Sequence, residues 1–153
     1  MTGGGTGIPE VHALLRVLAA GRDVLELGSA FGVGAAALAE TARRVVTVEI
    51  DPTRAAATRE RVRDLPNVET IEGDWRQVEG RFGLVFADHG QYDWERIVEL
   101  VEPGGYLVKD DLTPGRTVDG DPVREFLLRD ARLAAAEILT TPASAAIVAV
   151  RLP

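Results

Sequence analysis

The chain has 153 residues, and its 24 acidic side chains outnumber its 17 lysines and arginines, a balance that gives no general attraction to nucleic-acid phosphates. Apolar residues make up 46% of the chain, which suffices for the core of one domain and excludes a disordered chain. The lack of cysteine excludes disulfide scaffolds, thiolate zinc sites and cysteine nucleophiles.

Hydrophobic spacing and turn residues predict alternating helices and strands. Pro9 suits the first turn of a helix that Gly21 stops, while Asp51 and Pro52 open another helix as N-cap and first residue. The further predicted helices cover residues 34–42, 51–64, 92–101 and 121–129, with one or two helical turns within 74–80. The predicted strands cover residues 23–27, 45–50, 68–72, 82–87, 106–109, 134–140 and 145–152.

This alternation predicts an α/β fold, a three-layer Rossmann-like doubly wound sheet that is mostly parallel. The last two strands follow one another with only a Thr-Pro turn between them, which predicts an antiparallel C-terminal hairpin at one edge. No repeat or linker divides the sequence, so residues 1–153 are interpreted as a single domain with a flexible lead-in at residues 1–7.

No apolar run approaches the roughly 20 residues that cross a bilayer. Residues 1–7 lack the basic and apolar regions of a signal peptide. We therefore expect a soluble, cytoplasmic protein.

Ligands of doubly wound sheets bind where the strands end, and the turn after the first strand is rich in small residues. Gly28, Ala30 and Gly32 allow a ligand close to the backbone, and the following helix offers free N–H groups. This pattern is typical of a nucleotide or nucleoside site. The alternative is a glycine-rich turn that serves only the packing of strand and helix.

Acidic residues also follow the second and third strands. Glu49 lies 21 positions after Gly28, where a carboxylate can accept both ribose hydroxyls. Asp74 can bond an exocyclic adenine amine, and Trp75 can cover the ring. The alternatives are a solvated acid at Glu49 and a loop acid beside a half-buried tryptophan.

Three aspartates follow the fourth and fifth strands: Asp88, Asp110 and Asp111. At one rim they would repel one another unless protonated, hydrogen-bonded or neutralised, for instance by Mg²⁺. The alternative is that they cap segments and bond backbone N–H groups. His89 is a candidate general base or a solvated loop residue, and His12 is expected on the surface.

In order and spacing, these motifs resemble those of class I S-adenosylmethionine-dependent methyltransferases. The resemblance runs from about Pro9 to Leu152. It is carried by residues 24–32, 45–51, 72–75, 82–92 and 101–112 and by the final strand pair.

This resemblance implies that Glu26, Gly28 and Gly32 cradle the methionine and ribose part of S-adenosyl-L-methionine. It also implies ribose binding by Glu49 and an adenine site framed by Asp74 and Trp75. The candidate cofactor-binding residues are Glu26, Gly28, Ser29, Gly32, Glu49, Ile50, Asp74, Trp75 and Asp88.

Within this class, Asp88 and residues 104–115 resemble the small-molecule O-methyltransferases of the catechol and caffeoyl-CoA type. The candidate metal ligands are Asp88, Asp110 and Asp111, with Mg²⁺ as the candidate ion, and the candidate catalytic residues are His89 and Asp88. Asp111 departs from this pattern because it stands where asparagine is usual, and Gln91 stands where a catalytic lysine is expected.

The resemblance implies methyl transfer to a small-molecule acceptor, through an oxygen, by in-line displacement. Two alternatives stay open: a catalytically degenerate cofactor-binding partner subunit, and an NAD-binding oxidoreductase fragment. The expected partner is a small acceptor, with no nucleic acid and no membrane, and a homodimer stays open.

Overall fold

The computed structural model describes residues 7–88 and 92–153, and every predicted helix and strand is present there. The strands are β1 (Asp23–Leu27), β2 (Arg44–Glu49), β3 (Val68–Glu72), β4 (Phe82–Ala87), β5 (Val101–Leu112), β6 (Leu133–Thr141) and β7 (Ser144–Arg151). The helices are α1 (Pro9–Ala19), α2 (Val33–Ala39), α3 (Pro52–Val62), α4 (Trp94–Leu100) and α5 (Pro122–Arg129), with a 3₁₀ turn, η1 (Trp75–Gln77).

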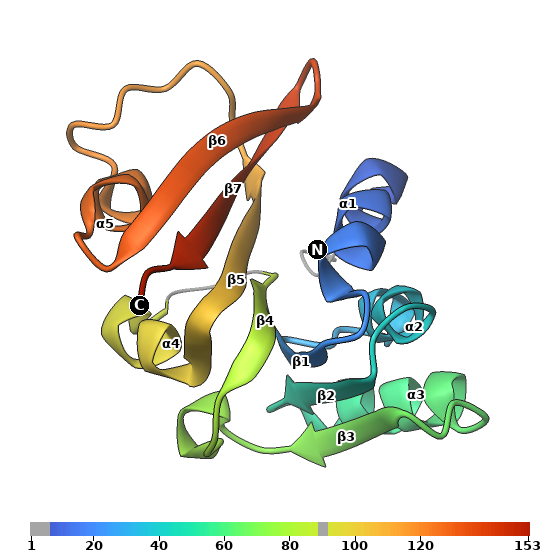
Figure 1. Cartoon of the computed structure of the whole chain (residues 1–153). Helices are drawn as coiled ribbons and strands as arrows, with labels where there is room; N and C mark the ends of the chain where they lie inside the picture. The colour runs from blue at the N-terminus through green and yellow to red at the C-terminus, as the bar shows by residue number, and fades with distance from the viewer. Residues whose placement is uncertain (1–6, 89–91) are drawn as a thin grey trace.

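The described strands form one sheet in the order β3-β2-β1-β4-β5-β7-β6 (Figure 1). The pairs from β3 through β5 are parallel, whereas β7 runs antiparallel to both β5 and β6. The mostly parallel doubly wound sheet with an antiparallel C-terminal hairpin is therefore confirmed.

Three helices begin at an aspartate whose carboxylate accepts a hydrogen bond from the backbone N–H three residues ahead. Asp51 does so at α3, Asp93 at α4 and Asp121 at α5. The N-cap at Asp51 is the predicted one. Asp93 explains why α4 begins later than predicted, because the chain before a cap is not helical.

The fifth strand is longer than predicted, since it takes in the Pro103-Gly104-Gly105 turn. Phe82 of β4 pairs with Val101, but Leu84, two residues on, pairs with Tyr106. The turn is thus a bulge within β5, and not a separate connection before the strand.

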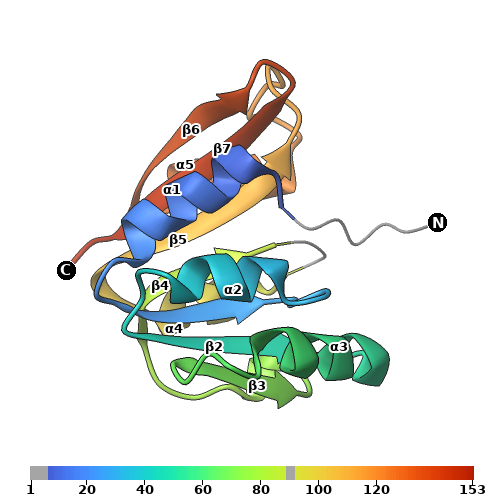
Figure 2. The same ribbon diagram turned by 90° about the vertical axis from the view of Figure 1, so that its right-hand side faces the viewer.

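The sheet carries α1, α2 and α3 on one face, which Figure 2 turns toward the viewer, and α4 and α5 on the other. Neighbouring residues of one strand serve opposite faces, as expected from the alternation of side chains. Val24 packs with α1 and α2, whereas Leu25 and Leu27 pack with α4.

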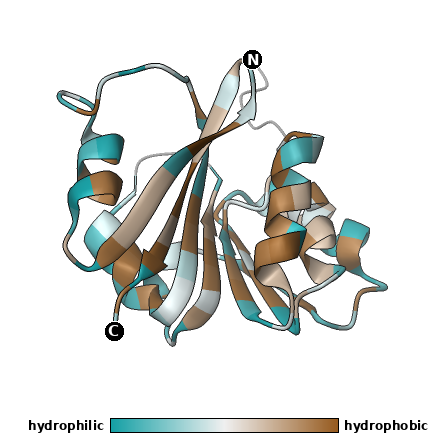
Figure 3. Cartoon of the chain, turned by 45° about the horizontal axis from the view of Figure 1, so that its top comes forward, coloured by the Kyte–Doolittle hydropathy of each residue, from teal (hydrophilic) through white to brown (hydrophobic). Residues whose placement is uncertain are grey.

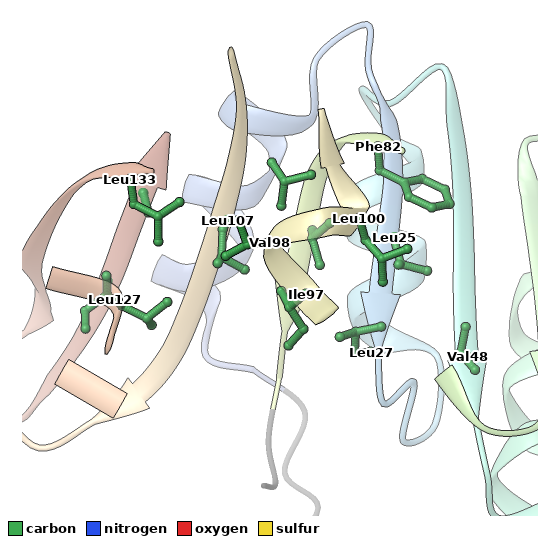
Figure 4. Packing of buried hydrophobic residues seen from close by; sticks show 14 of the residues in the cluster. Leu25, Leu27, Val48, Phe82, Ile97, Val98, Leu100, Leu107, Leu127 and Leu133 are labelled. Carbon is green, nitrogen blue, oxygen red and sulfur yellow. The ribbon is translucent and has the colours of Figure 1, made fainter. Parts of the chain in front are cut away.

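Each face therefore has its own apolar core. Figure 4 shows the core beneath α4 and α5, where Ile97 and Leu100 of α4 and Leu127 of α5 lie against strand residues such as Leu25 and Leu107. Figure 3 shows apolar stretches along the central strands, while the helices mix apolar with polar residues. Among the described residues no helix combines the length and the apolar composition that crossing a membrane requires. The parallel strands β1 to β5 all end at one edge of the sheet, where the candidate residues lie.

Candidate functional site

A pocket of about 480 Å³ opens where β1, β2 and β3 end. Five of the predicted cofactor-binding residues line it: Gly28, Glu49, Ile50, Asp74 and Trp75. The fold thus brings together residues from three separate strand ends. The other lining residues are Leu27, Val48, Asp51, Arg54, Gly73, Arg76 and Tyr92. No sequence pattern had marked Arg54, Arg76 or Tyr92 as a site residue.

Glu49 is the most firmly positioned acid of this pocket, and it is 5% exposed. One carboxylate oxygen accepts from the N–H of Ala30 at 3.1 Å, and the other accepts from the N–H of Asp51 at 3.0 Å. These bonds join the turns after β1 and β2 through one side chain. Each carboxylate oxygen can accept a second bond, so Glu49 can still receive two hydroxyl donors from a ligand.

In the turn after β1, one residue lines the pocket and two others pack against α3. Gly28 lines the pocket with φ +88°, and its N–H donates to the carbonyl of Val48 at 2.9 Å. Gly32 and Ser29 lie outside the pocket lining. A Cβ at Gly32 would stand 3.1 Å from Cα of Thr58, and the buried Ser29 hydroxyl lies 2.9 Å from that of Thr58. The contacts of Gly32 and of the Ser29 side chain therefore agree with the alternative interpretation, in which the turn serves the packing of strand and helix.

Glu26 also lies beneath the turn and not on the pocket wall. It is 1% exposed, and its carboxyl accepts from the Thr47 hydroxyl at 2.6 Å. A Cβ at Gly34 would stand 2.3 Å from its other oxygen, so the glycine there makes room for Glu26. Burial, with a smaller contribution from the charges of Asp88 and Asp110, raises the pKa of Glu26 to about 8. Glu26 is therefore mainly neutral at pH 7.

Asp74 and Trp75 form the side of the pocket at the end of β3. Asp74 caps η1 by accepting from the N–H of Arg76 at 2.9 Å, and it also pairs with the Arg76 guanidinium at 2.9 Å. Trp75 is half-buried and meets the edge of Tyr92, with ring centroids 5.8 Å apart. The Tyr92 hydroxyl donates to the carbonyl of Leu27 at 3.2 Å. Two aromatic rings therefore wall the pocket beside a carboxylate.

The predicted magnesium site is not supported. Asp110 is buried at 4% exposure, whereas the next residue, Asp111, is exposed with φ +57°. Within residues 7–88 and 92–153, no three His, Asp or Glu side chains gather as a metal site would require. The Lys109 ammonium donates to the carbonyls of Asp110 at 2.7 Å and Asp88 at 3.3 Å, so a cation already joins these strand ends. Adjacent aspartates on one strand end diverge, and this separates the expected ligands.

Asp110 nevertheless lies in an unusual environment. Burial raises its pKa to about 7, and the neighbouring Asp88 carboxylate adds to the shift. Asp88 itself is half-buried at the end of β4. Its predicted cofactor and catalytic roles stay predictions.

The predictions for the two histidines have different outcomes. His89, the candidate general base, lies outside the described residues, as does Gln91. The prediction that His12 lies on the surface is wrong: it is half-buried on α1, and its Nε2 is buried. Burial, together with the charge of Arg16, lowers the pKa of His12.

Comparison with known proteins finds methyltransferases that this chain is similar to. No family model matches the chain. Protein-L-isoaspartate O-methyltransferase of Rhodopseudomonas palustris (strain BisB5) is 33% identical over 97 residues, which make up 60% of this chain and 45% of that relative. The match thus spans less than half of the relative's length.

Solved structures of methyltransferases match nearly the whole chain, and two of them serve as examples. An O-methyltransferase from Bacillus cereus in complex with S-adenosylhomocysteine has a TM-score of 0.78 at 20% identity, covering 95% of this chain and 83% of its own. An rRNA methylase from Streptococcus thermophilus has a TM-score of 0.75 at 19% identity, covering 97% and 98%. The Rossmann-like methyltransferase fold implied by the sequence motifs is therefore confirmed.

Proposed function

We propose that this chain transfers a methyl group from S-adenosylmethionine to a small-molecule acceptor. The observation that carries the proposal is Glu49, which lines a pocket of about 480 Å³ and is held there by two backbone N–H groups. A carboxylate so fixed, with lone pairs to spare, suits the two hydroxyls of a ribose. When bound, S-adenosylmethionine supplies a methyl carbon activated by its sulfonium.

The other pocket residues suit the remaining parts of that molecule. Trp75 and Tyr92 offer apolar ring surface for a base, and Asp74 offers an acceptor beside them. Gly28 leaves the turn after β1 open to the methionine part. Glu26 would support that turn from below by its bond to Thr47, without touching the ligand.

The charge of the site also favours this donor. S-adenosylmethionine carries a positive sulfonium, and the carboxyl groups of Glu49, Asp88 and Asp110 come from the ends of β2, β4 and β5, on either side of β1. Attraction between opposite charges strengthens where water is excluded. Because transfer discharges the sulfonium, the site would hold the product less firmly than the donor through this interaction.

We also propose that the acceptor is a small molecule and that the methyl group is transferred to one of its oxygen atoms. The net charge of −7 and the single lysine, Lys109, argue against a general hold on a polyanion. The oxygen rests on the resemblance of the sequence motifs, and one matched structure is likewise described as an O-methyltransferase. Because an rRNA methylase has the same fold, RNA is the competing acceptor in the test of this proposal.

Calorimetric titration with S-adenosylhomocysteine tests the donor site. Glu49→Ala is expected to weaken binding about 10- to 100-fold, since hydrogen bonds to a charged group are worth about 1.5–3 kcal/mol. Glu72→Ala is the matched control: Glu72 ends the neighbouring strand but is exposed and pairs with Arg59 at 3.1 Å. Equal binding by Glu49→Ala and wild type, or no binding by wild type, would contradict the proposal.

A transfer assay with labelled S-adenosylmethionine then tests the acceptor. A panel of phenols and amines is compared with ribosomal RNA, and the position of the new methyl group is read by mass spectrometry and NMR. Label on a phenol oxygen supports the proposal. Label on RNA moves the acceptor to a nucleic acid, and binding without any transfer supports the degenerate partner subunit.

A further inference from the structure

The outermost described strands of the sheet are β3 and β6, and they differ in how their free edges are protected (Figure 1). An edge strand presents unpaired backbone N–H and C=O groups, and charged side chains commonly keep a further strand away from them. β3 is five residues long and carries the exposed Glu69 and Glu72, which pair with Arg44 and Arg59. The edge at β3 is therefore short and charged.

β6 lacks this protection. It is nine residues long and contains no proline, and its register against β7 shifts only near its end. Its one charged side chain, Glu137, is bound by the buried Arg124 of α5. Residues 133–150 contain no other charged side chain, although 27% of the whole chain is charged. The edge at β6 is therefore long and uncharged, and no described strand pairs with its outer side.

The pairing with β7 indicates which backbone groups of β6 point outward. The N–H of Leu152 donates to the carbonyl of Arg132 at 2.8 Å, in continuation of the register between the two strands. Hydrogen-bonded and non-hydrogen-bonded pairs alternate along an antiparallel ladder. It follows that Ala135 and Glu137 turn their N–H and C=O groups away from β7, toward the free edge.

The side chains of β6 match those of a second, antiparallel copy of the same strand. Ala134 and Ala136 are exposed, and Ile138, on the same face, is 37% exposed. When two such strands pair about Ala136, each Ile138 stands opposite the partner's Ala134. A large apolar side chain then meets a small one on both sides of the two-fold axis.

The same register matches the backbone groups and the charges. The outward N–H and C=O groups of Ala135 face those of the partner's Glu137, as a hydrogen-bonded pair requires. The two Glu137 carboxylates stand opposite alanines, and each stays bound to its own Arg124. The contact therefore sets no like charges opposite one another, although each chain carries a net charge of −7.

We infer that β6 docks on β6 of a second copy of this chain, as an antiparallel pair about Ala136 that joins two sheets into one. The free backbone groups call for a strand, and the alternation of small and large side chains, without charge, is matched by the same strand reversed. The contact is independent of the proposed methyl transfer, because β6 and the pocket-forming strands β1 to β3 lie at opposite ends of the strand order.

Analytical ultracentrifugation of the whole chain tests the contact. Wild type is expected to sediment with twice the mass of one chain and to dissociate on dilution. Ala136→Lys and Ala136→Glu should each be monomeric, because two like charges meet at the axis. An equimolar mixture of these two variants should form the dimer again, since the charges that meet are then opposite.

Ala56→Lys and Ala56→Glu are the matched controls, because Ala56 is an exposed alanine on α3, far from β6 in the strand order. Both should sediment as wild type does, and melting curves by circular dichroism verify that every variant folds. A monomeric wild type, a dimer that persists in Ala136→Lys, or a mixture that stays monomeric would overturn the inference. So would assembly beyond a dimer, because a two-fold contact of one edge closes on itself.

Amide hydrogen exchange, followed by NMR, tests whether the backbone edge itself is used. The amides of Ala135 and Glu137 should be protected in wild type and should lose this protection in Ala136→Lys. The amide of Ile138, which bonds toward β7 by the same alternation, should stay protected in both proteins and is the internal control. Equal exchange of the Ala135 amide in the two proteins would refute strand pairing at this edge.

Discussion

At the scale of single residues, Glu26 places an ionisable group in the core directly beneath the turn after β1. Its pKa rises to about 8 in the folded protein, against 4.5 in an exposed glutamate. The folded state therefore keeps a proton that the unfolded chain has lost over this range. It follows that Glu26 stabilises the fold fully below about pH 4.5, and that this stabilisation is lost as the pH rises through about 8.

Glu26→Gln should weaken this pH dependence. The amide oxygen can still accept from the Thr47 hydroxyl, but it carries no titrating proton. Melting temperatures measured between about pH 5 and 9 should fall less steeply in Glu26→Gln than in wild type. Part of the slope should remain, because the pKa of Asp110 is raised as well, to about 7.

Glu69→Gln is the control for that experiment, since Glu69 is exposed and pairs with Arg44 on the neighbouring strand. It should leave the slope as in wild type. If Glu26→Gln and Glu69→Gln gave the same slope, burial of Glu26 would not control the pH dependence.

At the scale of elements, α5 is held to the C-terminal hairpin by one buried arginine. Arg124 is 1% exposed, and it donates to both carboxylate oxygens of Glu137 on β6 at 2.7 and 2.8 Å. It also donates to Asp121, the N-cap of α5, at 2.6 Å and to the carbonyl of Thr113 at 2.7 Å. The guanidinium thus joins the start of a helix, a strand and a loop, and pairing raises its pKa.

Arg124→Met should lower the free energy of unfolding by about 3–5 kcal/mol, because the carboxylate of Glu137 is left without its partner. The double variant Arg124→Met/Glu137→Met should recover much of that loss, since an apolar pair needs no counter-ion. Urea unfolding of the three proteins gives the comparison. Arg129→Met, on the same helix but exposed and paired with Asp119, should change stability by less than about 1 kcal/mol. A loss in Arg124→Met no larger than in Arg129→Met would contradict this account.

At the scale of the whole molecule, binding at the pocket should stabilise the entire chain, because the strand ends that form it belong to one sheet. S-adenosylhomocysteine at 100 times its Kd should add about 2.7 kcal/mol, which corresponds to roughly 5–10 °C in Tm for a chain of this size. Differential scanning fluorimetry measures the shift.

Two controls make the shift specific. At the same concentration Glu49→Ala should gain only about 0.4–1.4 kcal/mol, because its Kd is expected to be about 10 to 100 times higher. NAD should produce none in wild type. A shift with NAD and none with S-adenosylhomocysteine would favour the oxidoreductase reading over the methyltransferase proposal.

Local sequence determined most of the elements and several of the residues that line the pocket. Short apolar stretches bounded by turn residues placed β1, β3 and β4 at their observed bounds, and Asp51 with Pro52 marked the start of α3. Glu49 could be selected as a site residue because it ends a predicted parallel strand. In a doubly wound sheet, ligands bind where such strands end. Signals of this kind involve neighbours in the chain, so one sequence suffices to detect them.

Tertiary packing decided what the sequence could not. Whether Ser29 faces a ligand or Thr58 depends on where α3 lies against the turn, 29 residues further along the chain. Asp110 and Asp111 are chemically alike in the sequence, and only the burial of one strand face separates them. His12 lies on the polar side of its own helix, yet it is half-buried because α1 packs over the sheet. Burial depends on contacts between segments that are far apart in the sequence, so helical periodicity alone does not predict it.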